Sequence, residues 1–115
     1  MAGGCWRPGA QRIIVLHTDE IAKGGPDPFV AGALYMPWPT GPSWTTVRPR
    51  LTTDGTLVFT ILDDDYYPTS APDQYRQMAT DLGQPTTDVY IEAGTGGLGS
   101  ACDAIVARVR AITGT

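Results

Sequence analysis

The chain has 115 residues, of which 42% are hydrophobic and 17% charged, and its formal net charge is −4. This length and composition indicate one small globular domain and exclude a disordered chain. Basic residues are few and scattered, with Lys23 as the single lysine, which argues against a nucleic-acid partner. No apolar run is long enough for a membrane span, and the first residues lack the apolar core of a secretory signal.

Apolar runs and amphipathic stretches divide the chain into alternating segments. The first run, RIIVLHTDE, is continuously apolar before it turns polar, which is typical of a strand buried on both faces of a parallel sheet. Many prolines and glycines follow, and they argue against a long regular helix between Ile21 and Pro49. The predicted order is strand 11–20, long irregular loop 21–55, strand 56–63, helix 70–83, strand 87–93 and helix 100–113.

The two predicted helices have apolar residues at helical spacing. Serines at their starts, Ser70 and Ser100, are suitable N-caps. The first helix has an apolar stripe at Tyr75, Met78, Ala79 and Leu82. The last helix has an expected buried stripe at Cys102, Ile105, Val106, Val109 and Ile112. Cys5 and Cys102 lack metal-ligand spacing, so we expect two free thiols, with one long-range disulfide as the alternative.

Strands that alternate with helices predict an α/β fold, in which helices pack on a mostly parallel sheet in three layers. Ligands of such sheets bind at the carboxyl ends of the strands. Asp19 and Glu20 end the first strand and Asp63 and Asp64 end the second, so all four should lie at one edge. The sequence makes Asp19 the best candidate metal ligand, because a carboxylate past a buried strand suits a divalent ion. Thr18, Glu20, Asp63 and Asp64 form a possible binding face around it, whereas His17 is interpreted as a packing residue at the strand end.

The string WRPGAQRIIVLHTDE, from Trp6 to Glu20, resembles the middle of a von Willebrand factor type A domain, also called an integrin I-like domain. GTLVFTILDDD is similar to the next strand of that family, and the last helix is similar to its closing helix. The chain therefore resembles the C-terminal half of such a domain, without the D-x-S-x-S motif of its metal-ion-dependent adhesion site. Of the residues that form that site in the family, the resemblance matches only one in this chain, Asp19.

The resemblance implies a protein-interaction or adhesion module, not an enzyme, with an incomplete site that holds Mg²⁺ weakly or not at all. The expected partner is a protein, and the exposed first strand could instead pair with a second copy or with a missing N-terminal half. One alternative is a small metal-dependent hydrolase or phosphotransfer domain that uses the strand-end aspartates Asp19, Asp63 and Asp64. Another is a gene fragment without independent function.

Overall fold

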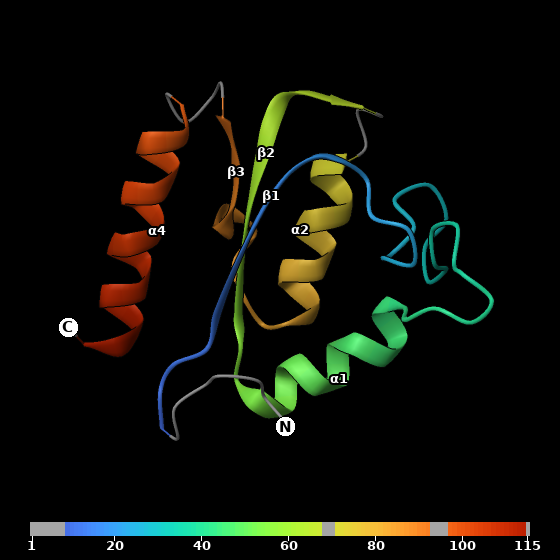
Figure 1. Ribbon diagram of the computed structural model, residues 1–115, viewed down its shortest axis with the longest axis horizontal. Helices are drawn as coiled ribbons and strands as arrows, with labels where there is room; N and C mark the ends of the chain where they lie inside the picture. The colour runs from blue at the N-terminus through green and yellow to red at the C-terminus, as the bar shows by residue number, and fades with distance from the viewer. Residues whose placement is uncertain (1–8, 68–70, 93–96, 115) are drawn as a thin grey trace.

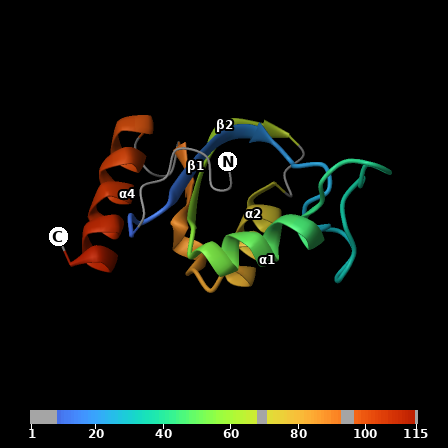
Figure 2. The same cartoon turned by 60° about the horizontal axis from the view of Figure 1, so that its bottom comes forward.

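The computed structural model describes residues 9–67, 71–92 and 97–114, with the backbone alone for 64–67. The elements follow one another in the order β1 (Ile13–Glu20), α1 (Trp44–Asp54), β2 (Leu57–Tyr67), α2 (Ala71–Asp81), the short 3₁₀ helix η1 (Thr86–Asp88), β3 (Val89–Ile91) and α4 (Leu98–Thr113). Figures 1 and 2 show α4 on one side of the strands and α1 with α2 on the other. No described helix is long and apolar enough to cross a bilayer.

The three described strands form one parallel sheet in the order β1-β2-β3. Ile13 of β1 lies beside Leu57 of β2, and Ile61 of β2 lies beside Tyr90 of β3. The register of β1 against β2 becomes irregular between Thr18 and Glu20. The predicted α/β class, with a parallel sheet between helices, is confirmed.

Alternation along β2 gives the sheet two apolar faces, because successive side chains of a strand point to opposite sides. On one face, Leu62 belongs to a cluster with α2 that also contains Ile21, Ala71, Tyr75, Ala79 and Val89. On the other, Phe59 and Ile61 pack with Ala101 and Ile105 of α4. The sheet is therefore the shared middle layer of two small cores.

Helix α1 lies inside the segment that the sequence predicted to be a loop over 21–55, so that prediction was wrong for this part. The helix begins after Ser43, whose backbone is extended, and ends at Gly55, which has a φ of 65°. Trp44 is buried and its Nε1 donates to Asp81 Oδ2 at 2.7 Å. These contacts at the two ends of α1 stabilise the helix by more than Pro49 destabilises it through the loss of one hydrogen bond in the helix interior.

The predicted strand 87–93 is shorter in the structure, because Thr86–Asp88 is a 3₁₀ turn and β3 is limited to three residues. Asp88 is fully buried and accepts hydrogen bonds from Arg108 of α4. Ala93, the last residue of the predicted strand, and Ser70 and Cys5 lie outside the described residues.

The buried stripe of the last helix differs from the prediction. Ala101 and Ile105 are buried, whereas Cys102 is an exposed free thiol and Val106 and Ile112 are 48% and 41% exposed. For Cys102 and Val106 the reason is the ion pair with Asp88, which requires α4 to turn Arg108 towards the sheet. That rotation moves the Cys102 and Val106 flank outward.

Candidate functional site

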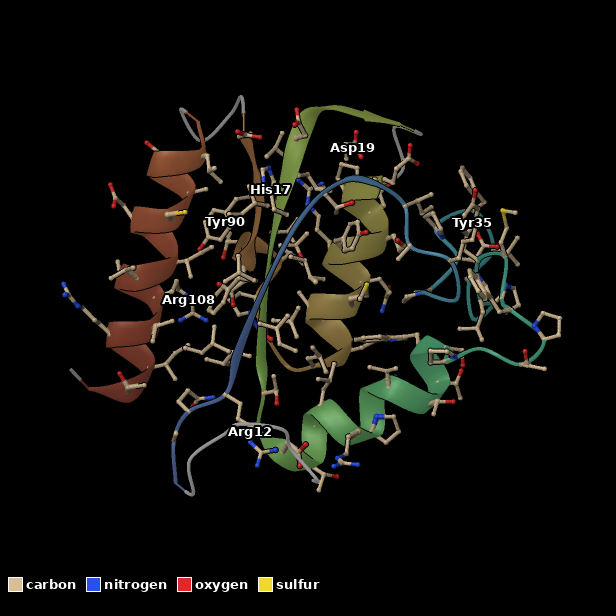
Figure 3. The ribbon with its side chains drawn as sticks, viewed as in Figure 1. Arg12, His17, Asp19, Tyr35, Tyr90 and Arg108 are labelled. Atoms are coloured by element: carbon tan, nitrogen blue, oxygen red, sulfur yellow. The ribbon has the colours of Figure 1, made fainter. Side chains whose placement is uncertain are left out.

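The carboxyl-terminal halves of β1 and β2 and the residue after β3 bring together an imidazole and two carboxylates. Because β2 continues to Tyr67, Asp63 lies within this strand and does not end it as the sequence predicted. His17 lies on β1 beside Ile61, Asp63 comes two residues after Ile61 on β2, and Glu92 comes two residues after Tyr90. Since Ile61 and Tyr90 belong to the core under α4, strand alternation directs His17, Asp63 and Glu92 to that same face. Figure 3 shows His17 at this end of the sheet.

One potential ligand atom from each of these three side chains lies within 4.8 Å of those of the other two. His17 Nε2 is 3.4 Å from Glu92 Oε2, and their side chains are 44% and 22% exposed. We call His17, Asp63 and Glu92 the strand-end triad. The triad is open to solvent on the side of His17.

The donors of the triad suit a first-row divalent ion. Imidazole nitrogen combined with carboxylate oxygen favours Zn²⁺ or Mn²⁺ over Mg²⁺, which prefers oxygen alone. Two ligands at about 2.1 Å from a tetrahedral ion are about 3.4 Å apart, so His17 and Glu92 already have a suitable separation. Three protein ligands also leave at least one coordination position for water or a partner.

Asp19, the ligand predicted from the sequence, is exposed and is not part of the triad. It lies at the same end of the sheet as His17 in Figure 3, past the point where the register of β1 becomes irregular. Of the predicted binding face, Asp63 alone belongs to the triad. The side chain of Asp64 lies outside the described residues.

Thr18 and Glu20 close the end of β1. Thr18 Oγ1 accepts the backbone N–H of Glu20 at 3.1 Å, and the Tyr75 hydroxyl donates to the Glu20 carbonyl at 2.7 Å. Burial raises the pKa of Tyr75, so its hydroxyl stays protonated as a donor. These contacts tie the segment after His17 to α2.

Arg108 and Asp88 fix the other side of the triad by joining β3 to α4. Arg108 Nε and Nη2 donate to the two oxygens of Asp88 at 2.8 and 3.1 Å. This hydrogen bond raises the pKa of Arg108, and burial raises the pKa of Tyr90, with the Asp88 charge adding to it. Gln84 donates to the same carboxylate and holds both backbone groups of Val58 in β2. Figure 3 shows Arg108 and Tyr90 between α4 and β3.

The predictions from the sequence did not select two of the triad residues as ligands. His17 was interpreted as a packing residue, although it is exposed, and Glu92 was not considered. The rule that ligands gather at the carboxyl ends of parallel strands would have found Glu92 if it had been applied to the third strand as well.

Three cavities formed by residues that the structure describes lie on the α2 side of the molecule or near its long loop. One of about 570 Å³ surrounds Asp81 and Arg48, and one of about 420 Å³ lies between Asp27 and Gln77. The third, of about 320 Å³, is lined almost entirely by apolar side chains beneath β1 and α1. None of these three is lined by a residue of the triad.

Comparisons of the chain with protein-family models, with curated proteins and with solved structures found no match in any of the three. The chemistry of the site therefore rests on its own geometry.

Proposed function

We propose that the chain is an α/β interaction module that binds a divalent transition metal ion through the strand-end triad. The open coordination positions of the ion then accept a carboxylate from a protein partner. The observation that carries this proposal is the convergence of three ligand atoms, from three neighbouring parallel strands, to within 4.8 Å of one another. A lone Asp19 would hold an ion weakly, because hard cations need several oxygen ligands.

An interaction role is better supported than a catalytic one by the exposure of the triad. Enzyme sites for small molecules are concave and bury most of the ligand, whereas the side chain of His17 is 44% exposed. The resemblance to von Willebrand factor type A domains, which comes from the sequence alone, implies the same role, since that family binds partners through a cation at this edge. The ligand set proposed here differs, with a histidine in place of hydroxyl groups.

Calorimetric titration with Mn²⁺ tests the cation site and reduces interference from the thiols of Cys5 and Cys102, which prefer Zn²⁺. We expect one site per chain, with a dissociation constant on the order of 10–100 μM because the triad is exposed and supplies three ligands. Glu92→Gln and His17→Ala should each weaken binding by at least about tenfold, since even groups that only support a ligand contribute that much. Affinity should fall at acidic pH because protons compete for the ligand atoms.

Asp19→Asn is the matched control, because it removes a carboxylate from the same strand end without touching the triad. It should leave Mn²⁺ affinity within about twofold. If Asp19→Asn abolished binding and Glu92→Gln did not, the site would belong to Asp19 and the proposal would be wrong. The interaction role is tested by adding acetate to the Mn²⁺-loaded protein. Displacement of water from the ion should lower the water proton relaxation rate, and an unchanged rate would refute carboxylate binding.

A further inference from the structure

The free edge of β1 has the composition of a strand from the middle of a sheet. β1 lies at one edge of the described sheet, and Figure 1 looks onto this edge, with β1 drawn in front of β2. Its first four residues, Ile13 to Leu16, are all apolar and include none of the lysines or prolines that normally protect an edge strand. Such an edge pairs readily with another strand.

The backbone hydrogen bonds between β1 and β2 determine which backbone groups of β1 face the open edge. The Arg12 carbonyl accepts the N–H of Leu57 at 2.9 Å, so residue 12 directs its groups to β2. Because the direction alternates along a strand in a parallel ladder, Ile13, Val15 and His17 direct their N–H and C=O groups to the open edge. In the described part of the chain no strand meets them.

The side chains next to this edge are also only partly covered on both faces. On the α4 face, Val15 is 49% exposed, because α4 covers β2 and β3. On the opposite face, Ile14 and Leu16 line the apolar groove of about 320 Å³ beneath α1. An added strand would therefore bury apolar surface on both sides as well as satisfy backbone groups.

We propose that this edge pairs with β1 of a second copy of the chain, antiparallel about a two-fold axis at Val15. Val15 then lies opposite the Val15 of the partner copy, and Ile14 lies opposite its Leu16 over the groove. Charge favours this direction because β1 ends in Asp19 and Glu20, whereas Arg12, which precedes β1, already forms an ion pair with Asp54 at 3.0 Å. Antiparallel pairing keeps the acidic ends of the two strands apart, whereas parallel pairing would put them together.

The pairing gives a reversible dimer. Five residues of strand and the rim of one groove are a smaller contact than the roughly 800 Å² per partner of a standard interface. We therefore expect a dissociation constant in the micromolar range, with dimers dominant in concentrated solution and monomers in dilute solution.

Light scattering coupled to size exclusion, over a wide range of concentrations, tests the pairing. The wild-type chain should change from monomer to dimer as concentration rises. Val15→Lys places two like charges opposite each other and should weaken the dimer by about 100-fold or more. Val106→Lys is the matched control, because Val106 on α4 is 48% exposed and belongs to neither core cluster. It should dimerise as the wild type does.

Cross-linking tests the register independently. In a chain with Cys5→Ser and Cys102→Ser, a Val15→Cys pair would have Cα atoms about 5.5 Å apart, which is within the range of a disulfide. Oxidation should give a covalent dimer with Val15→Cys and not with Val106→Cys. A wild-type chain that stayed monomeric at every concentration would overturn the proposal. So would a dimer that Val106→Lys dissociates and Val15→Lys does not, which would assign the interface to α4.

Discussion

The ion pair between Asp88 and Arg108 gives the sharpest stability prediction. Asp88 is fully buried and accepts two hydrogen bonds from Arg108, whose side chain is 33% exposed. Arg108→Ala removes both donors and leaves a carboxylate in the core with Gln84 as its remaining side-chain donor. A buried charge that loses its partner destabilises the folded state far more than the loss of a surface pair does.

The structure sets the size of the effect. Breaking a fully buried ion pair costs about 3–5 kcal/mol. The exposure of Arg108 means that water screens part of this pair, so we take the lower end, about 3 kcal/mol. That is a large part of the roughly 5–15 kcal/mol that stabilises a typical domain. In an Asp88→Asn background, Arg108→Ala leaves no buried charge without a partner. The same change should then lower the free energy of unfolding by only about 1 kcal/mol, the value of an ordinary hydrogen bond.

Urea unfolding followed by tryptophan fluorescence and circular dichroism measures this double-mutant cycle. We expect a coupling of about 2 kcal/mol between positions 88 and 108. Arg110→Ala is the control on the same helix, because Arg110 is exposed, and it should change stability by at most about 0.5 kcal/mol. If the cycle gave a coupling below about 0.5 kcal/mol, the ion pair would not be what joins β3 to α4.

Three further substitutions test other parts of the fold. Pro49→Ala restores a hydrogen bond inside α1 and should stabilise the chain by about 2 kcal/mol with a gain in helical circular dichroism; a loss of stability would show that the proline is required there. Gly25→Ala would put a Cβ 2.7 Å from Gln74 Nε2, which donates hydrogen bonds to the carbonyls of Ala22 and Pro26. We therefore expect the free energy of unfolding in urea to fall by about 1–3 kcal/mol. Gly99→Ala is the control, because a Cβ there would meet open space, and it should not destabilise the chain. Tyr75→Phe should cost about 1 kcal/mol at neutral pH. Because the pKa of Tyr75 is raised in the folded state, the unfolded chain releases its proton first, and wild-type stability should fall as pH rises above about 10, less steeply in Tyr75→Phe; equal slopes would contradict this account.

The sheet and the order of most elements could be predicted from the sequence, because they follow from local patterns. Continuous apolar runs gave β1 and β2, and the spacing of Tyr75 and Ala79 gave α2. Helix α1 has no such pattern. It has one buried residue, Trp44, and an interior proline, so its position depends on a contact with Asp81, which is 37 residues away in the sequence.

The sequence predicted the edge of the sheet where the triad lies, but it selected only one of the three triad residues. The rule that ligands gather at strand ends pointed to this edge and to Asp63. Which side chains meet there depends on register, and a shift of one residue turns a side chain to the opposite face. The pairing of Ile61 with both His17 and Tyr90 brings His17 and Glu92 together, and neither strand alone contains that information.

His17 belongs to both proposals, because its side chain is in the triad and its backbone faces the open edge of β1. Pairing with a second copy would order this end of β1 before an ion arrives, so less entropy would be lost on binding. Coupling between binding events is reciprocal, so Mn²⁺ should strengthen the dimer by the factor by which the dimer strengthens Mn²⁺ binding, which we expect to be about fivefold or more. The measurement is Mn²⁺ affinity well below and well above the dimer dissociation constant. Val15→Lys should show the weaker, monomer affinity at both concentrations. Equal wild-type affinities would show that the triad is fully ordered in the monomer and that the two surfaces act independently.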